Sequence, residues 1–225
     1  MEFKLKYLIF LGLFSWMEVQ GQPPTKQDVL DKFGFTAHQI VHGIDTIDFY
    51  LHQKSGKKPN KLVLYLQGTA PDPLFNIEKQ KKTYQSYRWF PGDYKLLDDS
   101  YAYAVIAKKG IPGIFEIGTE RNVRQYQTFN SLDNRVVRAD AVINHLATVQ
   151  MPELDKIIVY GHSEGAPVAA KLGTLNDKIT HIGFWAGNAL PDFYDFVLFN
   201  FKAMYEGRQT RKEAFADLEA LIADF

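Results

Sequence analysis

Short apolar runs separated by turns predict several strands between residues 34 and 188. Two segments, 34–41 and 46–52, alternate apolar and polar residues, which is typical of strands with one face exposed. Four continuous apolar runs predict strands buried on both faces, as in a parallel sheet. These runs are Lys61–Gln67, Tyr101–Ala107, Ile157–Tyr160 and Ile179–Ala186.

Helical periodicity fills some of the intervals between these strands. Residues 27–33 predict a short helix, and Ser131–Val149 predicts a longer amphipathic one with Asn130 or Ser131 as its N-cap. The expected buried face of the longer helix contains Val136, Val137, Ala139, Val142, Ile143 and Leu146, and the opposite face contains Asn134, Arg135, Arg138 and Asn144. The resulting order of strands and helices predicts a doubly wound, mostly parallel α/β sheet.

Three connections are less regular. Residues 55–61 predict a hairpin-type turn, and residues 110–127 predict a long loop. Residues 72–100 have no clear period and carry several aromatic side chains. We expect those side chains mainly to cover a hydrophobic face, although the wall of a substrate site is the alternative.

The most informative stretch joins the run Ile157–Tyr160 to a helix of small residues through Gly161-His162-Ser163-Glu164-Gly165. A sharp strand-to-helix turn leaves no room for side chains at Gly161 and Gly165 and holds Ser163 above the sheet. The N–H of Glu164, at the start of the helix, is then free to donate to an oxyanion. The alternative is a tight turn with an incidental serine.

This strand, turn and helix resemble the nucleophile elbow, G-x-S-x-G, of the α/β-hydrolase superfamily, particularly its serine esterase and peptidase-like branches. The resemblance covers residues 35–188 and implies that Ser163 is a nucleophile. It also implies a second oxyanion donor in the loop after Lys61–Gln67. There the N–H of Thr69 is the expected donor, and Gly68 permits the close approach of the backbone. An ordinary Gly-Pro loop is the alternative.

The resemblance is incomplete at its C-terminal end. The superfamily places an acid and then a histidine after further strands, and neither is identified here, since the last histidine is His181. Three explanations stay open, namely a truncated chain, a degenerate relative that binds without turnover, or an unusual base. We expect truncation, because residues 191–225 are strongly helical and resemble a lid inserted over the site, leaving the sheet edge uncovered.

Composition narrows the possible partners and cofactors. The 26 basic and 26 acidic residues give a formal net charge of zero, which provides no support for a nucleic-acid partner. Cysteine is absent, so disulfides, thiolate metal sites and a cysteine nucleophile are excluded. No dinucleotide loop, phosphate loop or metal-ligand spacing occurs, and we expect neither cofactor nor metal. The oligomeric state is not predicted.

The first 21 residues resemble a secretory signal peptide. Lys4 and Lys6 precede the apolar run Leu8–Met17, and small residues near Gly21 suit cleavage. An uncleaved anchor or a buried helix is the alternative. We therefore expect an exported protein, without stable membrane insertion after cleavage, with a signal peptide at 1–21, an α/β-hydrolase-like core at 22–190 and a helical segment at 191–225.

These features together favour an exported serine hydrolase that cleaves an ester or peptide-like acyl bond of a small-molecule or peptide substrate. The expected site residues are Ser163 as nucleophile, Glu164 and Thr69 as oxyanion donors, and Gly161, Gly165 and Gly68 at the structural turns. The rival hypothesis is a catalytically inactive hydrolase-like domain that binds a small acyl or peptide ligand. Acyl transfer would use the same nucleophile.

Overall fold

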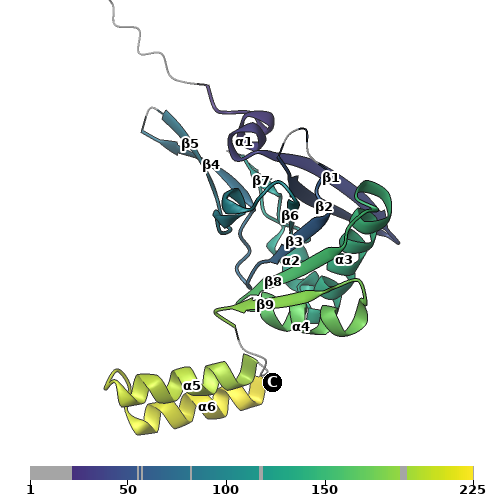
Figure 1. Ribbon diagram of the computed structural model, residues 1–225. Helices are drawn as coiled ribbons and strands as arrows, with labels where there is room; N and C mark the ends of the chain where they lie inside the picture. Colours follow the sequence, from purple (N-terminus) through teal and green to yellow (C-terminus); the bar gives the residue numbers. More distant parts are fainter. Residues whose placement is uncertain are drawn as a thin grey trace, which may run out of the picture.

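The computed structural model describes residues 22–54, 56, 58–81, 83–116, 119–187 and 192–224. A six-stranded sheet lies at its centre, in the order β1-β2-β6-β3-β8-β9 (Figure 1). These strands are β1 (Phe35–His42), β2 (Asp45–His52), β3 (Lys61–Leu66), β6 (Tyr101–Ile106), β8 (Lys156–His162) and β9 (His181–Trp185).

The inner part of this sheet is parallel. β3 pairs with β6 and β8, and β8 pairs with β9, all in parallel register, whereas β1 and β2 are antiparallel additions at one edge. The predicted mixed α/β class with a mostly parallel sheet is confirmed. The strands β2 and β3 do not form the hairpin that a hairpin-type turn at 55–61 would join, however, because β6 lies between them in the sheet.

Each face of the sheet has its own hydrophobic core, because successive side chains of a strand point to opposite faces. On one face, Leu62 and Leu64 of β3 pack in a cluster with helices α3 (Leu132–His145) and α4 (Gly165–Leu175). On the other face, Tyr65 packs in a second cluster with helix α1 (Lys26–Phe33). Figure 1 shows α3 and α4 beside one another against the sheet.

A second, three-stranded sheet was not predicted. It consists of β4 (Phe75–Gln80), β5 (Thr83–Arg88) and β7 (Ile114–Phe115), in the order β5-β4-β7, followed along the chain from β5 by a 3₁₀ turn at Asp93–Leu96. Phe75 of β4, Phe90 after β5 and Tyr94 of the 3₁₀ turn are buried in the core shared with α1, as expected of covering aromatic residues. The predicted loop at 110–127 is therefore also partly regular, since it contains β7 and the start of helix α2 (Val123–Phe129).

The buried face of helix α3 differs from the predicted one. Ser131 caps it as expected, by accepting a hydrogen bond from the N–H of Asn134. Val137, however, is 49% exposed, whereas Arg138 is only 8% exposed. The guanidinium of Arg138 pairs with Asp45 and donates to the carbonyl of Ala107 at 3.0 Å. A buried arginine with such partners is stable where an unpaired one would not be, and the helical period alone does not reveal those partners.

Helices α5 (Asp192–Tyr205) and α6 (Arg211–Asp224) pack on each other and are drawn beyond the β9 edge in Figure 1.

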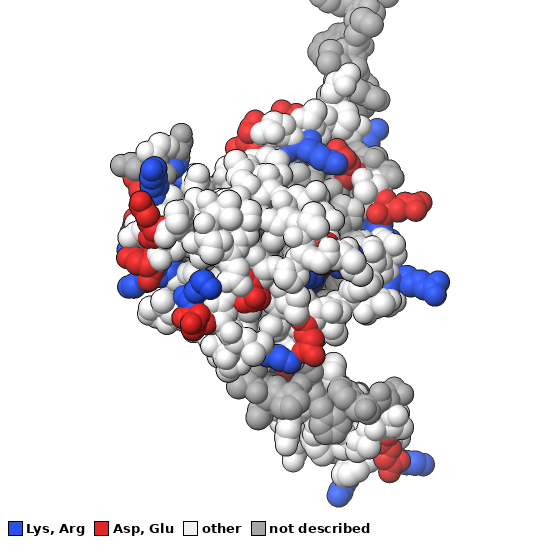
Figure 2. Space-filling view, turned by 90° about the vertical axis from the view of Figure 1, so that its right-hand side faces the viewer, with Lys and Arg blue, Asp and Glu red and all other residues white. Residues whose placement is uncertain are grey.

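The expected signal peptide and the expected boundary at 190/191 lie outside the described residues. Within the described part of the chain, no helix is both long and apolar enough to span a bilayer. Figure 2 shows basic and acidic side chains interspersed on the face that it presents.

Candidate active site

Ser163 lies at the apex of the turn between β8 and α4, in an unusual backbone conformation. Its φ is +51°, in the left-handed region that residues other than glycine rarely occupy. The turn is held on both sides, because the Ser163 N–H donates to the carbonyl of Trp185 at 2.9 Å and its carbonyl accepts from the N–H of Ala166 at 2.8 Å. Such strain persists only where the surroundings impose it, and it is common at functional sites.

Close contacts surround the glycines of the turn, and backbone atoms leave no room for a side chain at Gly161 and Gly165. A Cβ placed on Gly161 would lie 2.3 Å from the carbonyl oxygen of Gly165. A Cβ on Gly165 would lie 2.2 Å from the carbonyl oxygen of Leu66, at the end of β3. A Cβ on Gly68 would lie 3.0 Å from the Cβ of Ser163. The loop after β3 and the start of α4 therefore approach each other at the serine.

Glu164 presents its backbone and its side chain to different surroundings. It is the N-cap of α4, but its carboxylate forms no capping hydrogen bond. Instead the carboxylate accepts hydrogen bonds from Arg135 at 2.7 Å and from Asn130 at 3.3 Å, which ties the turn to helix α3. Its N–H has no acceptor among the described residues, as is typical at the start of a helix.

An open cavity of about 330 Å³ borders Ser163. The structure brings Ser163, Gly68 and Thr69 together on its wall, while Glu164 is the next residue along the chain from the serine. The described residues that line the cavity come from the ends of β3, β6 and β8 and from the loops that follow β3 and β5. They are Tyr65, Gln67, Gly68, Thr69, Ala70, Asp72, Trp89, Lys108, His162 and Ser163.

Two lining residues were not expected as such. Trp89, 47% exposed, lines this cavity, although we expected the aromatics of 72–100 mainly to cover a hydrophobic face and gave the wall of a site only as the alternative. Lys108 lies two residues beyond the end of β6, and its pKa is lowered to about 7 by burial and by the nearby Arg135, despite Glu164 and Asp72. Its position at the carboxyl end of an inner strand was an available signal, because ligands bind at that edge of open α/β sheets.

The histidines do not complete a triad. All six lie in the described part of the chain, and no hydrogen bond joins any of them to Ser163 there. His162 lines the cavity, and its ring centre lies 4.8 Å from that of Trp185. His181 bonds to the neighbouring Thr180, as a strand-face residue would. Among the described residues, no group of three or more metal-ligating side chains is found.

The sequence matches no protein-family model and no curated protein. Solved structures nevertheless resemble this fold. An acylaminoacyl peptidase aligns with a TM-score of 0.50 at 13% identity, over 73% of this chain and 24% of its own. A thermostable carboxyl esterase from Bacillus coagulans aligns with a TM-score of 0.48 at 13% identity, over 79% of this chain and 53% of the esterase. A dienelactone hydrolase from Anabaena variabilis aligns with a TM-score of 0.46 at 12% identity, over 68% of this chain and 63% of the hydrolase.

These structural matches concern the fold, because their sequence identities are low. They also differ in length from this chain, which spans about half of the esterase and about a quarter of the peptidase.

The backbone contact at Gly165 provides a test of this geometry. We expect Gly165→Ala to lower the free energy of unfolding by about 1–3 kcal/mol, because the new Cβ would overlap rigid carbonyls at the end of β3. Urea denaturation of the purified chain measures this change. Gly173→Ala is the matched control in the same helix, since its Cβ would meet only the end of the Ile182 side chain, which can rotate away. Equal effects of the two substitutions would contradict the contact.

Proposed function

We propose that this chain, which has the fold of the α/β-hydrolase superfamily, carries the nucleophile of a serine hydrolase that cleaves an ester or peptide-like acyl bond. The observation that carries this proposal is the backbone of Ser163, at a φ of +51° between β8 and α4 and on the wall of an open cavity. A strained serine between a strand and a helix, at the carboxyl edge of a parallel sheet, is the geometry of the nucleophile elbow, which exposes a serine hydroxyl for acyl transfer.

In the proposed reaction, Ser163 Oγ attacks the acyl carbon and loses its proton to a base. The carbonyl oxygen becomes an oxyanion, and the N–H groups of Glu164 and Thr69 donate to it. The intermediate collapses when the bond to the leaving alcohol or amine breaks and that group takes up the proton. Water then attacks the acyl-serine, which releases the acid and restores the hydroxyl.

The base and its acid partner are not identified among the described residues. Without a base, a serine hydroxyl is a weak nucleophile, although an oxyanion hole alone retains some rate. The reactivity of Ser163 in this chain is therefore the property to measure.

A fluorophosphonate probe tests the nucleophile directly, because it reacts covalently with activated serines. We expect the purified chain to be labelled slowly, at the residual rate that an oxyanion hole supports without a base, and Ser163→Ala to remain unlabelled, with both proteins shown to be folded by circular dichroism. Intact mass and in-gel fluorescence report the adduct. A folded wild-type chain without any adduct, or equal labelling of Ser163→Ala, would contradict the proposal.

The second candidate function is binding without turnover. It is favoured by the lack of any hydrogen bond between Ser163 and a histidine in the described part of the chain. An acyl or peptide ligand would then occupy the cavity without reacting. An unlabelled, folded chain that binds a short acyl ester in calorimetry, and loses that binding when Gly68→Leu narrows the cavity, would support this role over the first.

We propose further that the protein is exported and that residues 1–21 are removed in the process. The support is the charged start, the apolar run and the small residues near Gly21 in the sequence. When the full sequence is expressed in a bacterium with a secretory pathway, we expect the exported protein to begin at or near Gln22. Mass spectrometry of its N-terminus decides this, and a cytoplasmic product that retains residues 1–21 would contradict it.

A further inference from the structure

Side chains from other segments hold the loop after β3 along its length. The five carbonyl oxygens from Gln67 to Pro71 each accept a hydrogen bond from such a side chain. In order along the loop, the donors are Arg135, Lys108, Tyr126, Lys108 again and Arg121. Because backbone carbonyls set the direction of the adjoining N–H groups, these donors determine where the loop presents its own donors.

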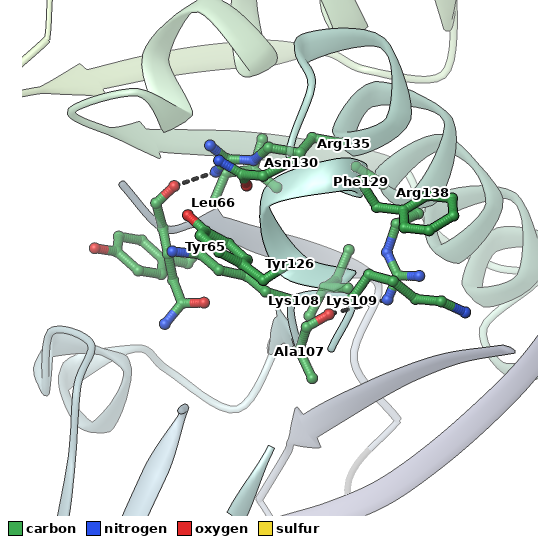
Figure 3. Close-up of a pocket in the computed structure, with 13 residues that line it drawn as sticks. Tyr65, Leu66, Ala107, Lys108, Lys109, Tyr126, Phe129, Asn130, Arg135 and Arg138 are labelled. Carbon is green, nitrogen blue, oxygen red and sulfur yellow. Dashed lines mark hydrogen bonds between the residues drawn. The ribbon is translucent and has the colours of Figure 1, made fainter. Parts of the chain in front are cut away.

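Lys108 makes two of these five contacts. Its Nζ donates to the carbonyls of Gly68 and Ala70 and lies 5.5 Å from the centre of the Tyr126 ring. Figure 3 shows Lys108, Tyr126 and Arg135 lining one pocket, next to helix α2. Lys108 also lines the Ser163 cavity. The lysine therefore lies between that pocket and the cavity, in contact with the loop.

The Gly68 carbonyl and the Thr69 N–H belong to the same peptide unit. In a trans peptide these two groups point in opposite directions, so the Thr69 N–H points away from the lysine that holds the carbonyl. No described residue accepts a hydrogen bond from this N–H. The unit also lies next to the serine, because a Cβ on Gly68 would lie 3.4 Å from Ser163 Oγ.

We propose that Lys108 is a positioning residue, which holds the Gly68–Thr69 peptide so that the Thr69 N–H is presented to an oxyanion formed at Ser163. This inference rests on the proposed function and deepens it, since it assigns the residue that orients the second oxyanion donor. Lys108 acts through the peptide and does not itself touch the reacting atoms.

The charge on Lys108 distinguishes positioning from a role as base. Burial and Arg135 lower its pKa, Glu164 and Asp72 act in the opposite direction, and the result is about 7. Below this pH the ammonium makes charge-assisted hydrogen bonds to the two carbonyls, and above it the neutral amine makes weaker ones. A positioning lysine therefore works best when protonated, whereas a base works only when neutral.

The experiment compares the rate of Ser163 labelling by a fluorophosphonate in four full-length chains, namely wild type, Lys108→Met, Lys108→Arg and Lys109→Met. We expect Lys108→Met to lower the maximal labelling rate at least ~10-fold with little change in the half-saturating probe concentration, since oxyanion donors act in the transition state. Lys108→Arg should keep much of the rate, because arginine still donates but cannot act as a base. Lys109→Met is the matched control, since Lys109 pairs with Asp45 instead.

Positioning also predicts a pH dependence. The ratio of the wild-type rate to the Lys108→Arg rate should fall as the pH rises through 7, because only the lysine loses its charge there. A ratio that rises with pH, or a Lys108→Arg chain as slow as Lys108→Met, would overturn the proposal in favour of a base. The pH dependence of this ratio distinguishes a positioning lysine from a base even if Lys108→Met does not fold.

A second readout does not depend on the proposed function. If the folded wild-type chain is not labelled at all, the proposed function fails, and the amide resonance of Thr69 in ¹H–¹⁵N spectra then tests the positioning role. We expect Lys108→Arg to leave this resonance nearly in place and Lys108→Met to shift it. If Lys108→Met does not fold, Lys108→Gln takes its place, and we expect the same shift. Lys109→Met should not shift it. An unshifted Thr69 amide in the folded Lys108→Met or Lys108→Gln chain would overturn the proposal.

Discussion

The candidate site depends on the close approach of helix α4 to the end of strand β3. Gly165 lies so near the carbonyl of Leu66 that no Cβ fits between them, and Gly161 lies equally near Gly165. The strand and the helix therefore meet in a sharp turn whose apex is Ser163. Ser163 consequently adopts a left-handed conformation, which is held by hydrogen bonds to Trp185 and Ala166. The conformational cost, on the order of 1–3 kcal/mol, is met by the packing of the strand and the helix.

The same approach places the loop after β3 beside the serine, where polar side chains hold it. Lys108 binds two carbonyls within this loop, and Arg135 connects the loop to the serine turn, because it binds both the Gln67 carbonyl and the Glu164 carboxylate. Glu164 thus neutralises a partly buried cation while its N–H remains available. Backbone donors held in this way need little reorganisation when charge develops, which is the physical basis of an oxyanion hole.

Much of this arrangement was predictable because local rules specify it. The apolar runs gave the inner strands, and the sequence Gly161-His162-Ser163-Glu164-Gly165 between a strand and a small-residue helix indicated the turn. The α/β-hydrolase fold implied by that resemblance is confirmed at the level of architecture. The roles of Ser163, Thr69 and Glu164 in catalysis stay predictions.

The missed features depend on contacts between residues distant in the sequence. The strands β4 and β5 carry mixed polar and aromatic residues whose pairing is set by the neighbouring core. Arg138 is buried because Asp45, 93 positions away, lies opposite it. Lys108 is informative only once the loop carbonyls that it binds, about 40 positions away, are known. No periodicity of one segment reveals such partners.

The central claim is that Ser163 is a nucleophile whose oxyanion is held by the N–H groups of Glu164 and Thr69. A crystal structure of the chain after reaction with a fluorophosphonate would test it most directly, because the phosphonyl oxygen mimics the oxyanion. We predict that the phosphorus is bonded to Ser163 Oγ and that its free oxygen lies about 2.7–3.1 Å from both backbone nitrogens. A phosphonyl oxygen directed toward solvent, or an unmodified Ser163 beside an adduct elsewhere, would contradict the claim.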